Sequence, residues 1–200
     1  HPRPDQRHVT YKDAIGLPKI ISTEFNIEGN PIEKFIELVC KIKPDQVTLV
    51  PDSIDAITSN SGWDTLKNKS FLKEVVSEFK NNGIRTSIFI DTELKLIEGA
   101  KNTGADRIEL YTESFAVNYL KGNKDEINKY INASILANDL GMGVNAGHDL
   151  SLENIHFFVD KIPYLDEVSI GHAIICESLY LGIENVVNMY LQKINNASKK

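Results

Sequence analysis

Cysteine is scarce in this sequence of 200 residues, which contains only Cys40 and Cys176. Two cysteines provide neither a disulfide framework nor the spacing of a metal site, so a reducing compartment is expected and the localisation is predicted to be cytoplasmic. One cysteine lies among apolar residues and the other follows an apolar run. We therefore expect both to be plain buried thiols.

Long apolar runs and basic clusters are missing as well. No run approaches the roughly 18 residues of a membrane-spanning helix, and no secretion signal is expected at the start, so no membrane partner is expected. Acidic residues outnumber basic ones, 28 to 22, which gives a net charge of -6. Since no block of Lys and Arg stands out, no nucleic-acid partner is expected. Phosphates can still be ligands, because backbone N–H groups and a few Arg or His suffice.

Short β-rich runs alternate with helical patterns along the chain. The expected strands cover residues 19–26, 46–50, 85–90, 107–110, 143–145 and 167–170. Apolar residues at helical spacing predict helices around 32–39, 71–79, 96–100, 127–140, 155–159 and 183–194. Asp91 or Thr92 is expected to cap the third of these helices, and Ser151 the fifth. Strict alternation of this kind implies parallel strands with right-handed crossovers.

Two α/β architectures fit this order, an open doubly wound sheet and a (β/α)8 TIM barrel. No G-x-G-x-x-G motif follows a strand, and polar residues lie at many strand ends, which favours the barrel. Residues 1–7 resemble a segment that follows a strand. We therefore expect residues 1–200 to form a single (β/α)-barrel domain with strands 3–8 and the end of strand 2. On this reading about one and a half βα units are missing before His1, so the barrel is N-terminally truncated.

The first eight residues are rich in His and Arg and contain no aliphatic residue. Paired Arg and His side chains in a loop make an anion site, although the same composition is found in solvated termini. Both readings stay open for this segment. The later polar loop 53–62, which includes Thr58, has the composition of a binding loop and also of loops without a function.

Two glutamates lie on expected strands. Glu28 continues the polar face of Asn26, and at a barrel mouth its carboxylate would suit proton transfer; the alternative is a surface residue before a turn. Glu109 interrupts an apolar strand and should not lie there unpaired. It either pairs with an Arg in a structural role or serves as an active-site carboxylate.

Two Gly-His pairs, Gly147-His148 and Gly171-His172, end successive expected strands. In barrels the last strand ends often build a phosphate site from glycine N–H groups and a helix N-terminus. A histidine there can donate or accept a proton near neutral pH. The repeat therefore predicts a barrel mouth that binds phosphorylated small molecules and transfers protons.

These motifs together resemble the pyridoxine 5′-phosphate synthase family, barrel enzymes that close the pyridine ring in bacterial vitamin B6 synthesis. The resemblance covers essentially all of residues 1–193. It is carried by His1-x-Arg3-x-x-x-x-His8, Asn26-Ile27-Glu28, Leu49-Val50-Pro51, Asn145-Ala146-Gly147-His148 and Ile170-Gly171-His172-Ala173.

The resemblance implies the condensation of 3-amino-2-oxopropyl phosphate with 1-deoxy-D-xylulose 5-phosphate, without a metal or organic cofactor, in a homo-octamer when the chain is full length. It implies proton acceptance by His1 and Glu28, proton donation by His148 and transition-state stabilisation by Glu109. It also implies contacts of Arg3, His8 and Thr58 with the deoxyxylulose phosphate. The amino-ketone phosphate is expected to contact Asp149, Gly171 and His172.

The sequence departs from the family at two places. Many members have Gly where this chain has Asp149, whose carboxylate would disfavour a phosphate unless it points away and leaves its N–H to bind. The family's first strand, with its Asn, Asp-His and Arg, has no counterpart before His1. An alternative is therefore a catalytically inactive fragment that only binds phosphates or self-associates. A further alternative is a metal-dependent hydrolase that uses His1, His8, His148 and His172.

Overall fold

A computed structural model describes residues 1–52 and 58–197, which form two compact units, His1–Glu109 and Leu110–Lys200. The hydrogen-bonded strand order is β1-β2-β3-β4-β5-β6, so neighbours in the sheet are neighbours in the chain. Each pairing with a described register is parallel. In these two ranges no helix is long and apolar enough to cross a membrane.

The first unit consists of three complete strands, the start of a fourth, and the helices between them. Its strands are β1 (Asn26–Gly29), β2 (Gln46–Leu49), β3 (Arg85–Ile90) and the first residues of β4 (Arg107–Tyr111). Its helices are α1 (Tyr11–Gly16), the short 3-10 helix η1 (Leu17–Lys19), α2 (Glu33–Ile42), α3 (Lys69–Asn81) and α4 (Leu94–Thr103).

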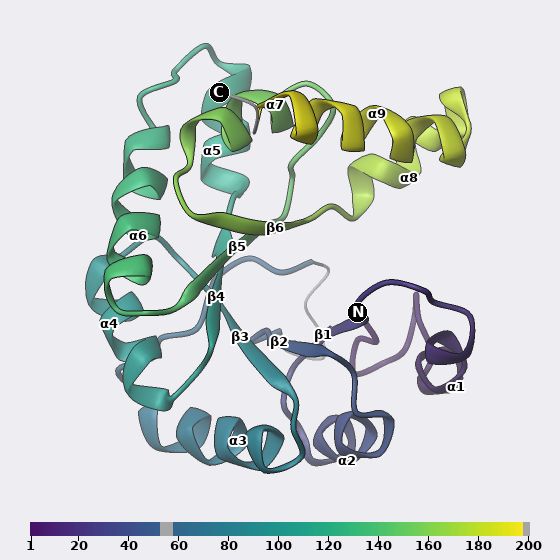
Figure 1. Ribbon diagram of the computed structural model, residues 1–200, viewed down its shortest axis with the longest axis vertical. Coiled ribbons are helices and arrows are strands. Elements are labelled where there is room, and N and C mark those ends of the chain that lie inside the picture. The colour runs from purple at the N-terminus through teal and green to yellow at the C-terminus, as the bar shows by residue number, and fades with distance from the viewer. Residues whose placement is uncertain (53–57, 198–200) are drawn as a thin grey trace. The chain divides into compact units, whose positions relative to one another are not determined.

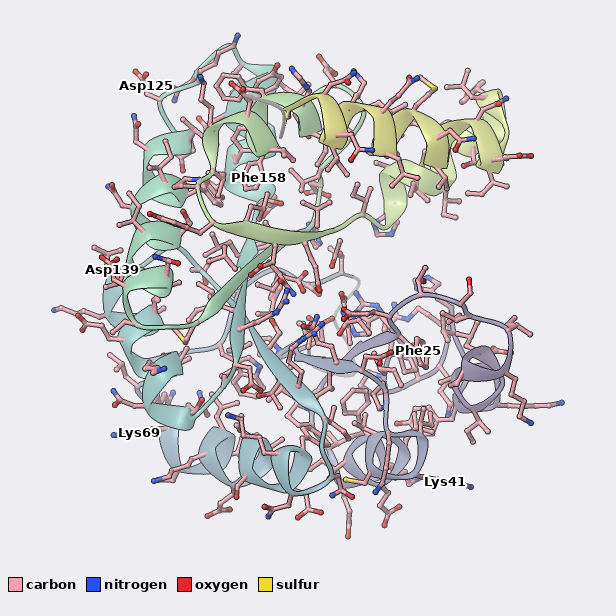
Figure 2. All side chains as sticks on the ribbon, viewed as in Figure 1. Phe25, Lys41, Lys69, Asp125, Asp139 and Phe158 are labelled. Carbon is pink, nitrogen blue, oxygen red and sulfur yellow. The ribbon has the colours of Figure 1, made fainter. Side chains whose placement is uncertain are left out.

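The helices of the first unit form because their apolar residues recur on one face. Phe35, Leu38 and Val39 of α2 are buried, and α3 buries Leu72 and Phe79 in the same way. These two helices contact each other and lie along the outer side of β2 and β3 (Figure 1). Figure 2 shows the charged tips of labelled residues such as Lys41 and Lys69 pointing away from this core.

The second unit repeats the strand–helix order. After the end of β4 it contains α5 (Glu113–Leu120), α6 (Ile127–Asp139), β5 (Gly143–Gly147), α7 (Ile155–Lys161), β6 (Leu165–Ser169), α8 (His172–Leu181) and α9 (Ile183–Ala197). Its core is aromatic: Phe158 (Figure 2) packs with its ring centroid 4.9 Å from that of Phe115 and 5.6 Å from that of Tyr130. The helices α8 and α9 contact each other (Figure 1).

A partly buried hydrogen bond joins α8 to α9. The Tyr190 hydroxyl donates to Glu177 Oε2 at 2.6 Å, and Glu177 Oε1 accepts from the Leu152 backbone N–H at 3.1 Å. Burial and the adjacent Glu177 carboxylate raise the pKa of Tyr190, so its hydroxyl keeps the proton that it donates. The rest of α8 is poorly covered: Leu179 and Tyr180 are 80% and 90% exposed.

Most expected strands are confirmed, with one clear error. The strand expected at 19–26 is wrong, because η1 occupies its start and β1 begins only at Asn26. Pro18 lies in the first turn of η1, and Ile20, which the prediction placed in the strand, is 80% exposed. The structure also contains α1, α5 and α8, which the hydrophobic pattern did not predict.

Other local expectations need correction. Glu93 and Asn154, rather than Asp91, Thr92 or Ser151, precede the first residues of α4 and α7. Cys176 is exposed and Cys40 only partly buried, so the prediction of two buried thiols is wrong. Burial and the carboxylate of Glu78 raise the pKa of the Cys40 thiol, which therefore stays protonated. The number of strands needs no correction, because the described residues contain six, as expected for this chain.

Candidate active site

The first unit gathers four of its charged side chains, His1, Arg3, Glu28 and Asp52, at the ends of β1 and β2; we refer to them as the Asp52 cluster. Arg3 and Asp52 form a buried ion pair, with 3.1 Å between Nη1 and Oδ2 and side chains only 7% and 2% exposed. His1 lies between two carboxylates. Its Nδ1 is 3.9 Å from Glu28 Oε2 and its Nε2 is 3.8 Å from Asp52 Oδ2.

This arrangement suits the transfer of a proton. Both His1 distances exceed a hydrogen-bond length, so the contacts are electrostatic. Carboxylates lie on both sides of the imidazole, and the charge of one of them, Asp52, is shared with Arg3. Glu28, on the strand next to Asp52, is itself within reach as a second proton acceptor. His1, Arg3 and Glu28 are thus brought together as acid–base and cationic groups.

A polar row crosses the sheet beside this cluster. The strand register pairs Glu28 with Thr48 and Thr48 with Ser87, so the three residues share one face. The Thr48 hydroxyl lies 3.3 Å from both Asn26 Oδ1 and Glu109 Oε2 and can donate its single proton to one of them. Glu109 is only 2% exposed. Its carboxylate is therefore buried beside the Thr48 hydroxyl of β2.

Two other predicted residues of this unit are less closely tied to the cluster. Thr58 is partly buried in the loop after β2, next to Ser59, whose hydroxyl donates to Asp52 Oδ2 at 2.9 Å. Residues 53–57 of the predicted binding loop 53–62 lie outside the described residues. His8 is exposed, and no ion pair or hydrogen bond of its side chain is found among the residues that the structure describes. Arg7 pairs with Asp5 at 2.7 Å instead of adding to an anion site.

The second unit places His148 in a strained turn directly after β5. His148 and Asp149 both have positive φ, 82° and 59°, which is unusual for residues other than Gly and is frequent at functional sites. The Thr112 backbone N–H and hydroxyl both donate to the Gly147 carbonyl, at 3.0 and 2.8 Å, and the hydroxyl also contacts the His148 carbonyl. These bonds hold the turn in its strained form.

The His148 ring is oriented from two sides. It packs edge-on against Tyr111, with 5.0 Å between ring centroids, and its Nδ1 lies 3.2 Å from Asp149 Oδ2. The Asp149 carbonyl accepts from Asn154 Nδ2 at 3.2 Å. Because the Asp149 carboxylate lies beside Nδ1, Nε2 is the ring nitrogen that is left to exchange a proton with a ligand.

The second Gly-His pair lies at the start of α8. Gly171 is its N-cap residue, and His172 is the first helical residue, with an exposed side chain. A Cβ added at Gly171 would meet no atom within 4 Å, so the space beside it is open. Backbone N–H groups at a helix start can bind an anion in such a space.

Two polar residues of these clusters were not predicted as site residues: Asp52 and Thr112. Asp52 directly follows the buried strand end Leu49-Val50-Pro51, a position that could have singled it out. No comparable signal marks Thr112, whose role depends on a carbonyl 35 residues further along the chain.

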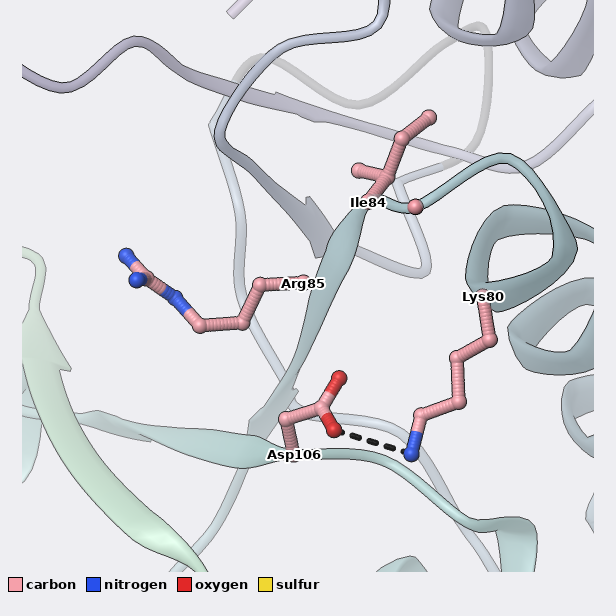
Figure 3. Close-up of a pocket in the computed structure, with 5 residues that line it drawn as sticks. Lys80, Ile84, Arg85 and Asp106 are labelled. Atoms are coloured by element: carbon pink, nitrogen blue, oxygen red, sulfur yellow. Dashed lines mark ion pairs between the residues drawn. The ribbon is translucent and has the colours of Figure 1, made fainter.

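A pocket of about 430 Å³ lies at the other ends of the strands, lined by Lys80, Gly83, Ile84, Arg85 and Asp106 (Figure 3). Lys80 Nζ pairs with Asp106 Oδ1 at 2.8 Å. Arg85 is occupied by Glu24 and Gln46, each at 2.7 Å. Because its cations are already paired and it lies at the amino ends of the strands, we assign this pocket a structural role.

A metal-dependent hydrolase needs ligands gathered around an ion. In residues 1–52 and 58–197 no group of three or more His, Cys, Asp or Glu side chains is arranged to hold a metal. The residues at the strand ends instead offer acids, bases and a cation. Parallel strands with such groups at their carboxyl ends are typical of barrel-type enzymes that act on small molecules.

Solved structures support this fold at low sequence identity. The chain matches a 3-keto-L-gulonate-6-phosphate decarboxylase from Vibrio cholerae with a TM-score of 0.61 and 11% identity, over 93% of this chain and 79% of that one. It matches a phosphoribosylanthranilate isomerase from Thermotoga maritima with a TM-score of 0.54 and 12% identity, over 95% and 81%. These likenesses establish a parallel, barrel-like α/β fold.

Sequence relatives identify the family. The model of the family described as "Pyridoxal phosphate biosynthesis protein PdxJ" matches residues 1–196. The chain is 66% identical to the pyridoxine 5′-phosphate synthase of Flavobacterium johnsoniae, over 97% of this chain and 82% of the relative. It is 61% identical to that of Christiangramia forsetii, over 96% and 81%. The chain therefore belongs to the pyridoxine 5′-phosphate synthase family, the enzyme family that its motifs predicted.

Proposed function

We propose that this protein condenses 3-amino-2-oxopropyl phosphate with 1-deoxy-D-xylulose 5-phosphate to pyridoxine 5′-phosphate, phosphate and water. The observation that carries the proposal is the 66% identity to a pyridoxine 5′-phosphate synthase over 97% of the chain. Such a ring closure requires an amine to attack a carbonyl, water and phosphate to leave, and a carbon–carbon bond to form. Each step moves a proton, so several acids and bases are needed.

The first unit supplies the groups for the deoxyxylulose phosphate. His1 and Glu28 accept protons, and carboxylates lie on both sides of the His1 imidazole. Glu109 stabilises the transition state from its buried position on β4. Contacts with the substrate come from Arg3, His8 and Thr58, of which the buried Arg3 offers a preformed cationic fork for a phosphate or hydroxyl.

The second unit supplies the groups for the amino-ketone phosphate. His148 donates a proton from Nε2, with its ring fixed by Tyr111 and Asp149. Asp149, Gly171 and His172 contact the phosphate. Because the Asp149 carboxylate is turned towards His148 Nδ1, it is the backbone N–H that we assign to the phosphate. These residues perform proton transfer and phosphate binding, and no metal or organic cofactor enters the proposed reaction.

The remaining proposals concern the whole protein. We propose that its strands belong to an eight-stranded (β/α) barrel in a single domain, that it assembles as a homo-octamer and that it works in the cytoplasm. The family membership supports these expectations. The match covers 82% of the length of the Flavobacterium johnsoniae relative. Light scattering coupled to size-exclusion chromatography measures the oligomer directly.

A product assay tests the function. The 200-residue chain and a chain extended to the length of its relatives are each incubated with both substrates, and pyridoxine 5′-phosphate and inorganic phosphate are quantified. The extended chain should release one phosphate per pyridoxine 5′-phosphate, because one of the two substrate phosphates is retained. If the extended chain is active and the 200-residue chain only binds the substrates, the given sequence acts as an inactive fragment. An extended chain that folds but forms no product contradicts the proposed function.

A further inference from the structure

Asp52 connects two separate parts of the first unit, the N-terminal segment and the loop after β2, through one carboxylate oxygen. Its Oδ2 lies 3.1 Å from Arg3 Nη1, 2.9 Å from the Ser59 hydroxyl and 3.8 Å from His1 Nε2. Arg3 and His1 belong to the N-terminal segment, and Ser59 belongs to the loop after β2. A single buried atom therefore determines how the N-terminal segment and this loop meet.

The main chain of Asp52 is fixed independently of its side chain. Its carbonyl accepts from Asn30 Nδ2 at 2.6 Å, and Asn30 directly follows β1, the strand that holds Glu28. The Val50 backbone N–H also donates to the carbonyl of Gly29, at 3.0 Å. The backbone that carries the carboxylate is therefore fixed relative to β1. The carboxylate is thus suited to hold other groups at a constant position relative to Glu28.

Burial of the Asp52 charge costs free energy of desolvation, so stability alone does not explain it. The Asp52 side chain is 2% exposed, and an apolar pair of similar volume would often stabilise a protein as well as a buried ion pair does. The ion pair lies at the carboxyl end of β2, where barrel enzymes bind their substrates. Its two further neighbours, His1 and Ser59, lie in the same region.

We propose that Asp52 is a positioning residue that holds Arg3 and His1 in the orientation needed for the deoxyxylulose phosphate. This inference rests on the proposed function, in which Arg3 contacts that substrate and His1 accepts a proton. Asp52 itself touches no reacting atom. It acts through Arg3, whose guanidinium it orients, and through His1, where its negative charge lies at the ring nitrogen opposite the one that faces Glu28.

The test is the effect of Asp52→Asn on the two substrates separately. The amide keeps the size of the side chain but removes the charge that holds Arg3. We expect the KM for deoxyxylulose phosphate to rise about tenfold and kcat to fall, because misplaced contact groups weaken binding and reaction together. The KM for the amino-ketone phosphate should stay within about twofold, since its contacts come from other residues. Asp52→Glu, which restores the charge, should recover most of the loss.

Asp106→Asn is the matched control. Asp106 is also an Asp that accepts from a cation, Lys80, and from a hydroxyl, Thr86, but it lies at the amino end of β4 (Figure 3). A purely structural effect of losing a paired carboxylate should appear in this variant too. We expect Asp106→Asn to lower the unfolding midpoint and to leave both KM values unchanged.

Each outcome separates the two proposals. If the wild-type extended chain forms no pyridoxine 5′-phosphate, the proposed function fails and the inference on Asp52 fails with it. If the wild type is active and Asp52→Asn keeps a normal KM for deoxyxylulose phosphate, or raises both KM values equally, only the inference on Asp52 is overturned.

Should Asp52→Asn not fold, Ser59→Ala removes one hydrogen bond to the same oxygen. It should raise the same KM alone, by about threefold; an unchanged value overturns the inference.

Discussion

Some of the residues in the candidate site could be predicted from the sequence, and others depend on contacts that form only in the folded chain. The position of His148 at a strand end was predictable, because β5 was recognised from the sequence, whereas Glu28 was singled out although the strand expected at 19–26 was wrong. The central place of Asp52 was not predictable, because its partner Arg3 lies 49 positions earlier in the sequence. Only the folded chain brings Arg3 Nη1 to 3.1 Å from Asp52 Oδ2. The positive φ of His148 was equally hidden, because it follows from hydrogen bonds to Thr112 rather than from local composition.

His148→Asn tests the proposed proton donor. Asn tolerates a positive φ better than most residues, so the variant should keep the turn while it loses the imidazole. We expect turnover to fall by about 10²-fold or more, as is typical when a general acid is removed, with an unchanged unfolding midpoint. His156→Asn is the control, since His156 is exposed and its Nδ1 lies 3.1 Å from the Lys193 carbonyl, and it should keep normal turnover. Turnover near the wild-type rate in His148→Asn removes His148 from catalysis.

Asp149→Gly tests which part of Asp149 meets the phosphate. Glycine accepts the φ of 59° without strain and keeps the backbone N–H, but it removes the carboxylate beside His148 Nδ1. If the N–H is the contact, the KM for the amino-ketone phosphate should stay within about twofold, while kcat falls because the His148 ring loses its partner. Steady-state kinetics with each substrate varied in turn give both values. A large rise in that KM alone would assign the contact to the carboxylate.

At the scale of helices and strands, hydrophobic periodicity worked where an element has one buried face. It predicted the helices α2 and α3, whose buried residues are all apolar and recur at helical spacing. It failed for α8, where apolar residues occur all round the helix and none is buried, so no face stands out. It also failed for β1, because the aliphatic residues before it form a turn that begins at Pro18.

A close approach between a loop and a strand end gives a prediction at this scale. A Cβ on Gly62 would lie 2.4 Å from Ile90 Cα and 2.5 Å from the Asp91 backbone N, and backbone atoms cannot move aside easily. Gly62→Ala should therefore destabilise the first unit by about 2 kcal/mol or more, like other overpacked sites. Urea unfolding followed by circular dichroism measures the change in free energy.

Gly16→Ala is the matched control for this prediction. Gly16 ends α1, has a φ of -79°, and would place its Cβ where no atom lies within 4 Å. The change should leave stability unchanged or raise it by up to about 1 kcal/mol, because Ala restricts the unfolded chain. Equal stabilities of the two variants would show that the loop carrying Gly62 relaxes away from β3.

At the scale of the whole molecule, the fold class was easier to predict from the sequence than the closure of the strands into a barrel. Alternation of strands and helices is enough to imply parallel strands, and the described strands are parallel where their register is known. Whether a barrel closes depends on pairing between its first and last strands, which no local pattern encodes. The division into units His1–Glu109 and Leu110–Lys200 likewise reflects contacts that only the folded chain reveals.

The stability of the first unit should depend on pH through Asp106. Burial alone would raise the pKa of this carboxyl, but the Lys80 ammonium and the Thr86 N–H and hydroxyl hold it below the ordinary value of 3.8. A carboxyl with a lowered folded pKa stabilises the fold above its unfolded pKa, and this contribution is lost as the pH falls through the folded pKa. Stability should therefore decrease below about pH 4.

Asp106→Asn removes this dependence because its amide does not titrate. Trp63 is the single tryptophan and is buried in the first unit, so its fluorescence during urea unfolding reports on the part that contains Asp106. Between pH 5 and about pH 3 the wild type should lose more unfolding free energy than Asp106→Asn, while the variant is the less stable protein at pH 7. Parallel losses for the two proteins would mean that the bonds of Asp106 to Lys80 and Thr86 do not favour its charged form in solution.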